Sequence, residues 1–373
     1  MERTQWAVSA AVCWASLFFV EASIGQVVSE FKNEADAVSH LHYAGGSEWL
    51  VAQADPESHW HRLPDLTDVT LNNFTVSREA LRYVLSLKQL KGLELGIGPE
   101  GIEIEPEDLE LLGAADHLDS LGLCFADMTN DHLRFLPEMD GLESLEISGI
   151  LSGDSRFTDE LAHVLVAVHK LRRIRIRSNN FTDEFVRILS EKRELESLDI
   201  GSPHLTDVSL ALIGQLPAMR KLRFSSPLVT DEGVRNLRGL AFLEELKIDS
   251  PKIGSEALSI VSELGRLTHL DLSLDTVRPE DLASLRKLKS LKILALRKVP
   301  LRNEEFSALL GHPSIESLFF EQAQLTEKSL PVIESLKMLK YVALSTKTEA
   351  SRHLLEEIAK RGIVDGSFYP KVK

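Results

Sequence analysis

The sequence predicts an α/β solenoid, a stack of short repeats in which parallel strands alternate with helices, and two observations predict it. An apolar phrase recurs every 24 residues through the second half of the chain, as the segments 195–200 and 243–248 illustrate. After most copies, apolar residues recur at every third position, which gives a helix one buried stripe. A fixed period in this range is typical of stacked-repeat proteins, which present one long continuous surface.

The repeated phrase, L-x-x-L-x-L, accounts for the strands. Its last two apolar residues lie two positions apart, so in an extended chain they point to the same face. Twelve copies begin at Leu66, Leu90, Leu118, Leu142, Leu171, Leu195, Met219, Leu243, Leu267, Leu291, Ile315 and Leu339. We expect each copy to be followed by a turn and a helix of about ten residues. A right-handed crossover then returns the chain to a parallel neighbour.

The expected helix starts carry a hydroxyl residue followed by a carboxylate. The hydroxyl oxygen accepts a backbone N–H of the first turn, and the acid is favoured at the positive end of the helix. These starts are Thr158, Thr182, Thr206, Thr230, Ser255 and Thr326. Strand and helix signals therefore alternate along most of the chain.

From Leu66 to Leu344 the chain resembles the leucine-rich repeat superfamily, and its Leu-Thr-Asp-Glu helix starts resemble the ribonuclease-inhibitor-like branch and repeats of secreted bacterial proteins. The resemblance implies a right-handed horseshoe with a parallel sheet on the concave face and helices on the convex face. The family often places Asn or Cys two residues after the strand, where the side chain bonds neighbouring backbone. That slot holds Pro203, Pro227 and Pro251 in three consecutive units. What satisfies the backbone there is left open.

The ends predict a signal peptide and two caps. An uncharged stretch from Trp6 to Val20 and the small residues Ser23 and Gly25 predict a secretory signal over residues 1–25. An N-terminal cap over 26–65, repeats over 66–345 and a C-terminal cap over 346–373 follow. We expect an exported bacterial protein, located in the periplasm, on the cell surface or in the medium. The alternative is an uncleaved N-terminal anchor, which would hold the protein at a membrane as a structural scaffold.

Composition narrows the class of partner. Removal of residues 1–25 leaves Cys124 as the one cysteine, so no internal disulfide is expected. The formal net charge of −15 speaks against non-specific binding of nucleic acid or anionic lipid. We therefore expect a protein partner.

A basic zone is predicted on the concave face, because in-register strands turn the sequence into a grid. Arg173, Arg175 and Arg177 share one face of one strand, and Lys221 and Arg223 follow two strands later. Arginine forks suit carboxylates, so these five residues predict a site for an acidic or mixed-charge partner. The alternative is a structural ladder of ion pairs, because the middle row alternates in sign from strand to strand.

An apolar zone is predicted further along the same face. Ile293, Phe319 and Tyr341 lie on successive strands, and an exposed cluster of this kind suits the centre of an interface. The alternative is that the C-terminal cap covers it, with Phe368 and Tyr369 reaching back.

Catalytic chemistry is not expected, and neither is a cofactor. His269 and Asp271 share a face with Asp249 one strand away and could hold a metal or a general base, so a metal-dependent enzyme is the remaining alternative. No nucleophile, phosphate loop or paired-carboxylate motif accompanies them. His59 and His61 are a weak zinc signal in the N-terminal cap. The acidic run from 103 to 108 is a similarly weak calcium signal. The sequence therefore predicts a binding module that is not an enzyme.

Overall fold

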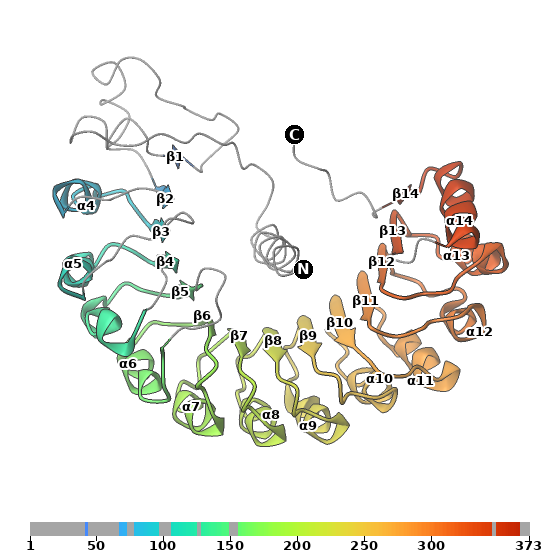
Figure 1. Ribbon diagram of the computed structural model, residues 1–373, viewed down its shortest axis with the longest axis horizontal. Helices are drawn as coiled ribbons and strands as arrows, with labels where there is room; N and C mark the ends of the chain where they lie inside the picture. The colour runs from blue at the N-terminus through green and yellow to red at the C-terminus, as the bar shows by residue number, and fades with distance from the viewer. Residues whose placement is uncertain are drawn as a thin grey trace, which may run out of the picture. The chain divides into compact units, whose positions relative to one another are not determined.

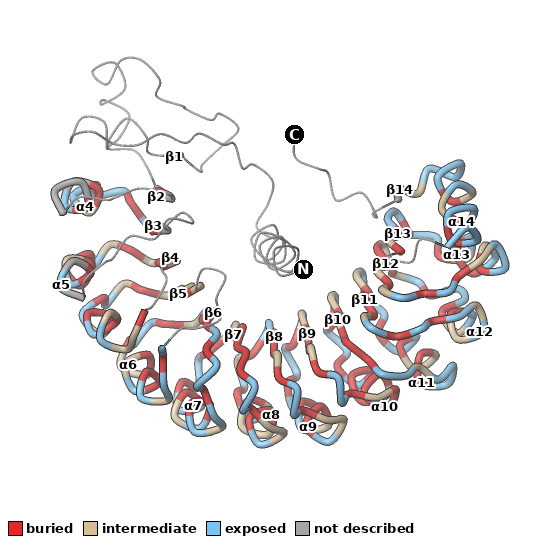
Figure 2. Tube along the Cα trace, viewed as in Figure 1, coloured by how far each residue is buried: buried red, intermediate tan, exposed pale blue. Residues whose placement is uncertain are grey.

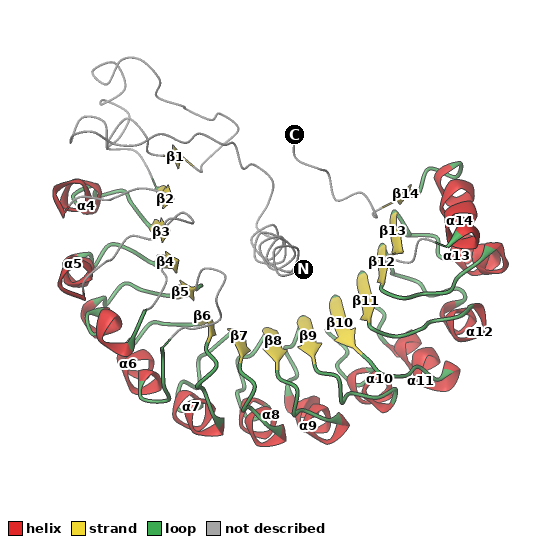
Figure 3. Ribbon diagram, viewed as in Figure 1, coloured by secondary structure: helices red, strands yellow, loops and turns green. Residues whose placement is uncertain are grey.

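The computed structural model describes residues 42–43, 67–72, 78–96, 106–124, 128–148, 156–344 and 348–365. The chain divides into two compact units, Met1–Asn180 and Phe181–Lys373. Within each unit, parallel strands alternate with short helices, and the helices lie on one side of the strands (Figures 1 and 3). The other side of the strands is called the open face below.

In the first unit, β2 to β6 pair in parallel and in chain order, and the two-residue strand β1 pairs antiparallel with β2. The strands are β1 (His42–Tyr43), β2 (Asp68–Asn72), β3 (Gly92–Gly96), β4 (Ser120–Cys124), β5 (Ser144–Ile147) and β6 (Arg173–Arg177). The helices are α4 (Arg78–Leu85), α5 (Pro106–Leu109) and α6 (Leu161–Ala167), with 3₁₀ turns η3 (Glu110–Ala114), η4 (Asn130–Leu133) and η5 (Leu136–Glu138).

In the second unit, β7 to β14 follow the same rule. The strands are β7 (Ser197–Gly201), β8 (Lys221–Ser225), β9 (Glu245–Asp249), β10 (His269–Ser273), β11 (Ile293–Arg297), β12 (Ser317–Phe320), β13 (Tyr341–Leu344) and β14 (Val364–Asp365). The α-helices are α7 (Asp183–Leu189), α8 (Asp207–Ile213), α9 (Asp231–Arg235), α10 (Glu256–Val261), α11 (Pro279–Ser284), α12 (Asn303–Phe306), α13 (Leu330–Ser335) and α14 (Glu349–Ala359). The 3₁₀ turns are η6 (Asn236–Gly239), η7 (Leu285–Lys287), η8 (Ser307–Leu309) and η9 (Glu327–Ser329).

The expected strand register is confirmed within both units. Leu222 pairs with Leu246, and Leu246 with Leu270, so residues 24 positions apart become neighbours. Wherever the structure describes their side chains, the apolar residues of the repeated phrase are buried, and so is the helical stripe at every third position in the second unit, as in Leu210, Ile213 and Leu216. Figure 2 shows this buried layer between strands and helices.

The helices are shorter than expected. None of those that follow β6 to β12 exceeds seven residues, and α9 and α11 continue into 3₁₀ turns. The predicted caps are confirmed at four starts, where the threonine hydroxyl accepts a backbone N–H two residues on: Thr182, Thr206, Thr230 and Thr326. Two predicted caps are wrong. The helix after Thr158 begins only at Leu161, and the Ser255 hydroxyl accepts the backbone N–H of Arg278 in the next repeat instead.

Buried serines supply the backbone bonds that the family's Asn or Cys would make. Ser226 Oγ donates to the carbonyl of Leu205 at 2.6 Å and accepts the backbone N–H of Leu228 at 3.2 Å. Ser178, Ser202 and Ser250 make the same two bonds in their own repeats. The serine lies one position before the slot that the sequence pattern singled out, so each turn is satisfied without an Asn or Cys.

The serine ladder ends at Leu274, and the turns of the later repeats differ. Lys298 and Gln322 lie 24 and 48 positions after Leu274, and both adopt positive φ, at 61° and 60°. A left-handed residue reverses the chain direction without a side-chain bond, at a cost for residues other than glycine. The last repeats therefore turn by backbone conformation instead of by a buried hydroxyl.

A second ladder joins the helix starts of neighbouring repeats. The carboxylate of Asp183 accepts the backbone N–H and hydroxyl of Thr206 and the hydroxyl of Ser209. Burial acts to raise the pKa of Asp183, but these bonds outweigh it and hold the pKa below its ordinary value. The carboxylate of Asp231 accepts the backbone N–H of Gly254 at 3.0 Å, because glycine occupies the position that threonine holds in the preceding repeats. Burial raises the pKa of Asp231.

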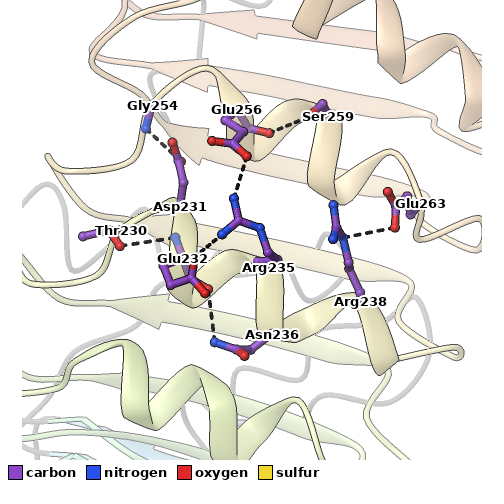
Figure 4. Close-up of polar contacts among 10 residues, drawn as sticks. All are labelled: Thr230, Asp231, Glu232, Arg235, Asn236, Arg238, Gly254, Glu256, Ser259 and Glu263. Atoms are coloured by element: carbon purple, nitrogen blue, oxygen red, sulfur yellow. Dashed lines mark hydrogen bonds and ion pairs between the residues drawn. The ribbon is translucent and has the colours of Figure 1, made fainter.

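Ion pairs on the helical side add to this ladder. Arg235 pairs with Glu232 on its own helix and with Glu256 of the next repeat at 2.6 Å, and Arg238 pairs with Glu263 at 3.1 Å (Figure 4). Exposed pairs of this kind contribute at most about 1 kcal/mol each. They align adjacent helices, while the apolar core supplies most of the stability.

The predicted C-terminal cap is partly described. Helix α14 lies within it, with Leu354 and Ile358 fully buried, and Gly362 follows the helix at a φ of 76°. The predicted signal peptide lies outside the described residues, as does the N-terminal cap apart from the backbone of β1. Across the described part of the chain, no helix is long and apolar enough to cross a membrane.

Two ionisable residues occupy a buried position that most repeats of the second unit fill with leucine. The equivalent residues are Lys192, Leu216, Leu240, Leu264, Leu288, His312 and Leu336. His312 is 1% exposed, and its Nε2 donates to the carbonyl of Leu285 at 3.1 Å. Burial lowers the pKa of His312 and of Lys192. Both residues thus favour their neutral forms more than they would in the unfolded chain.

Replacing Ser226 with alanine should lower the free energy of unfolding by about 1–3 kcal/mol, because a buried carbonyl and a backbone N–H each lose their partner. Urea unfolding followed by circular dichroism measures the change. The control is Ser225→Ala on the adjacent strand position, which is half-buried. A loss for Ser226→Ala no larger than for this control would contradict the ladder.

His312→Leu should become more stable relative to the wild type as the pH falls, whatever the loss of the hydrogen bond to the Leu285 carbonyl costs at every pH. The folded-state pKa of His312 lies below the ordinary value of 6.5, so the unfolded chain binds the proton more readily. The stability that neutral His312 permits is present above pH 6.5 and is lost as the pH falls through the folded-state pKa. Urea unfolding of wild type and variant on both sides of this value tests it. The exposed residue His204 provides the control, and a pH-independent difference between His312→Leu and wild type would refute the assignment.

Candidate functional site

The three arginines of the predicted basic zone lie on one face of β6. Arg173 and Arg177 are exposed, Arg175 is half-buried, and the isoleucines between them are buried. Arg175 Nη1 donates to Glu146 Oε1 on β5 at 2.6 Å. Arg173 lies 3.6 Å from the carboxylate of Glu143, which precedes β5. Arg175 is therefore an ion-paired step of the ladder, whereas Arg173 is exposed and lies within ion-pair distance of Glu143.

The other two residues of the predicted basic zone lie on β8 in the second unit. Lys221 Nζ donates to Glu245 Oε1 on β9 at 2.7 Å. Arg223 is half-buried and forms no ion pair with any residue that the structure describes. The predicted zone thus contains paired and unpaired cations, and Arg223 belongs to the second kind.

A chain of ion pairs that the sequence grid missed crosses the open face of the second unit. Arg297 donates two hydrogen bonds to the carboxylate of Asp271, at 2.7 and 2.8 Å, and lies 3.5 Å from Glu321. Lys247 approaches the same Asp271 carboxylate at 3.4 Å. The grid compared equal positions on neighbouring strands, whereas Arg297 reaches Asp271 diagonally.

The predicted apolar zone lies on β11 to β13. Ile293 and Phe319 are half-buried, and Tyr341 is 45% exposed. Ser317 is paired in register between Ile293 and Tyr341, and Ala295 beside Phe319. Strand β14 continues the sheet, with Val364 opposite Tyr341. Phe368 and Tyr369, expected to cover this zone, lie outside the described residues.

The residues weighed for catalysis are held by other partners. Asp271 is bound by Arg297, and Asp249 accepts a hydrogen bond from Lys298 at 2.7 Å. Burial acts to raise the pKa of Asp249, but the Lys298 bond and nearby positive charge keep it below its ordinary value. His269 Nδ1 lies 2.8 Å from Thr268 Oγ1, and burial lowers its pKa. These groups therefore form part of the ion-pair network.

Neither metal signal gains support in the described residues. No group of three or more metal-ligating side chains is found there. His59, His61 and most of the acidic run from 103 to 108 lie outside the described residues. Glu107 is exposed at the start of α5.

No family model matches the sequence, and no curated protein matches it. Among solved structures, the chain is similar to the internalin InlF of Listeria monocytogenes strain 4b F2365, at 19% identity over 77% of this chain and 82% of that chain, with a TM-score of 0.46. It is also similar to TLR13 in a TLR13–ssRNA13 complex, at 16% identity and a TM-score of 0.47. That match covers 77% of this chain but 44% of TLR13.

The fold follows from the repeat itself. Strands that open with the same apolar phrase pair in parallel at a fixed step, with a short helix between each strand and the next in the second unit. This arrangement is the leucine-rich repeat fold. The place of the chain in the ribonuclease-inhibitor-like branch stays a prediction.

Replacing Arg297 with glutamine should lower the free energy of unfolding by no more than about 1 kcal/mol, because cross-strand ion pairs in partly exposed positions contribute little. Leu294→Ala on the same strand should cost about 2–5 kcal/mol, because it empties a fully buried site. Chemical denaturation of both variants gives the comparison. Equal losses would mean that the ion-pair network, and not the apolar layer, stabilises this part of the sheet.

Proposed function

We propose that the protein is an exported, non-catalytic interaction module that binds a protein partner on the open face of its sheet. The observation that carries the proposal is the composition of that face. It presents arginine, lysine, carboxylate and aromatic side chains, whereas the helical side of the same strands is uniformly buried and apolar. Rigid repeats suit recognition by a preformed surface, which lowers the entropy lost on binding.

The proposed partner is acidic or mixed in charge. In the first unit, Arg173, Arg175 and Arg177 are the cations proposed to meet its carboxylates. In the second unit, Lys221 and Arg223 are the cations proposed for this role. Carboxylates of the protein already lie beside Arg173, Arg175 and Lys221, so the partner's carboxylates share these cations with Glu143, Glu146 and Glu245. Ile293, Phe319 and Tyr341 supply the apolar part of the same interface.

The second candidate is a structural scaffold held at a membrane by the N-terminal segment. It rests on the uncharged stretch from Trp6 to Val20, which cleavage after Gly25 would remove. N-terminal sequencing of the protein recovered from its source separates the two functions. A start near Gln26 favours the exported module, and an intact Met1 favours the anchored scaffold.

The variant Arg173→Ser/Arg175→Ser/Arg177→Ser should reduce partner affinity by about tenfold or more, because each replacement removes a charge-assisted donor. Proteins captured from the envelope and medium by the wild type, but not by the variant, identify the partner. Its affinity is then measured by calorimetry.

The matched control replaces three exposed cations of the second unit that lie outside the strands, Arg187, Arg193 and Lys289, with serine. This control should bind as the wild type does. Circular dichroism checks that both triple variants fold. Equal partner affinity of the arginine variant and the wild type would remove β6 from the binding surface.

A further inference from the structure

The middle row of the open face breaks its alternation of charge at one step. In the second unit this row reads Asp199, Arg223, Lys247 and Asp271 on β7 to β10, and register pairs Arg223 with Lys247. Adjacent strands lie about 5 Å apart, so two cations stand side by side. Like charges directly opposite each other destabilise a sheet. The Arg223–Lys247 pair, called the step below, therefore destabilises the sheet, whereas its neighbours in this row pair opposite charges.

The two cations of the step differ in their partners. Arg223 has no ion pair within the described residues, although Asp199 faces it in register. Lys247 lies 3.4 Å from the carboxylate of Asp271, which Arg297 already binds through two shorter hydrogen bonds, and its charge also acts on Asp249. Lys221 forms its own close pair with Glu245. Arg223 is therefore the less compensated cation of the step, and Lys247 shares its partners with other cations.

The pKa of the neighbouring His269 is also affected by positive charge on this face. Burial lowers the pKa of His269, Glu245 opposes this, and the positive charges of Lys221, Lys292 and Arg223 lower it further. A neutral His269 neither adds to the charge of the step nor competes for an incoming anion. The adjacent cations of the step therefore suit one further negative charge.

We propose that a carboxylate of the partner binds between the Arg223 guanidinium and the Lys247 ammonium, as part of an acidic protein segment laid on β8 and β9. The inference rests on the proposed function and assigns its central contact. A guanidinium fork binds a carboxylate through two bonds, and the lysine adds a point charge from the other side. Lys247 thus joins the binding surface that the sequence predicted with Arg223.

The charges around the step favour a carboxylate over a polyphosphate chain. Asp199, Glu245 and Asp271 lie on the adjacent positions, and the chain carries a formal net charge of −15. A single monoanion fits between two cations, whereas a nucleic-acid backbone would bring further phosphates against these carboxylates.

The experiment measures binding of hexaglutamate to the full chain by calorimetry at low ionic strength. Arg223→Gln and Lys247→Gln should each weaken binding by about tenfold. The matched control is Lys221→Gln, a cation on the same face that is already paired, and it should weaken binding less than about threefold. Thermal unfolding checks folding, and Lys247→Gln should change the melting temperature little, because it removes both the repulsion by Arg223 and the 3.4 Å pair with Asp271.

The outcomes separate this site from the proposed function. Wild-type affinity in Arg223→Gln and Lys247→Gln, with affinity lost in the β6 arginine variant, overturns the site and leaves the proposed function standing. Wild-type affinity in all these variants overturns both, as does an absence of hexaglutamate binding to the wild type. Tighter binding of tripolyphosphate through the same two residues overturns the assignment to a carboxylate.

Discussion

The parallel pairing of strands at a fixed step of 24 residues is the constraint on which the second unit depends. Because side chains alternate between the two faces of a strand, a slip of one residue would exchange the buried and open sets. Leu222, Leu246 and Leu270 are buried in this register, while Arg223 and Lys247, one position on, face outward. The buried core and the composition of the open face therefore depend on the same alignment, and neither can shift without the other.

Such close stacking leaves turn backbone buried, and two side-chain ladders satisfy it. The serine ladder serves the turns after the strands, and the aspartate ladder serves the helix starts. An unpaired buried polar group costs more than a bond contributes, so these small residues matter more than their size suggests. Where serine gives way to Leu274, the later turns at Lys298 and Gln322 use positive φ instead.

Strands, their register and the rows of the open face were predictable from the sequence, because they follow from period alone. The slot used by the family does not predict the serine ladder, because the serine lies one position earlier, in the Ser-Pro pairs at 202–203 and 226–227. Helix length was overestimated, since apolar spacing does not distinguish an α-helix from a 3₁₀ turn. The caps expected at Thr158 and Ser255 failed because hydroxyls also bond to other repeats.

Ion pairs were the least predictable part of the candidate site. Arg175 pairs with Glu146 directly across the strands, which a row comparison finds. Arg297 instead binds Asp271 diagonally across the strands. The register partner of Asp271 is Ala295, whose small side chain leaves room for the longer arginine side chain. Lys298 reaches Asp249 two repeats away, from a turn whose positive φ no pattern indicated. Side-chain reach and turn conformation decide such contacts, and neither is periodic.

These pairs shape what the open face of the second unit can select. A face that neutralises most of its own charge attracts acidic molecules weakly, so selectivity arises where pairing stops. The middle row is charged from Asp199 to Asp271 and apolar from Ala295 through Phe319 to Ala343. Charge complementarity governs orientation and the rate of encounter, whereas buried aromatic contacts supply affinity. A partner that spans both halves of this face is therefore held in one direction along the repeats.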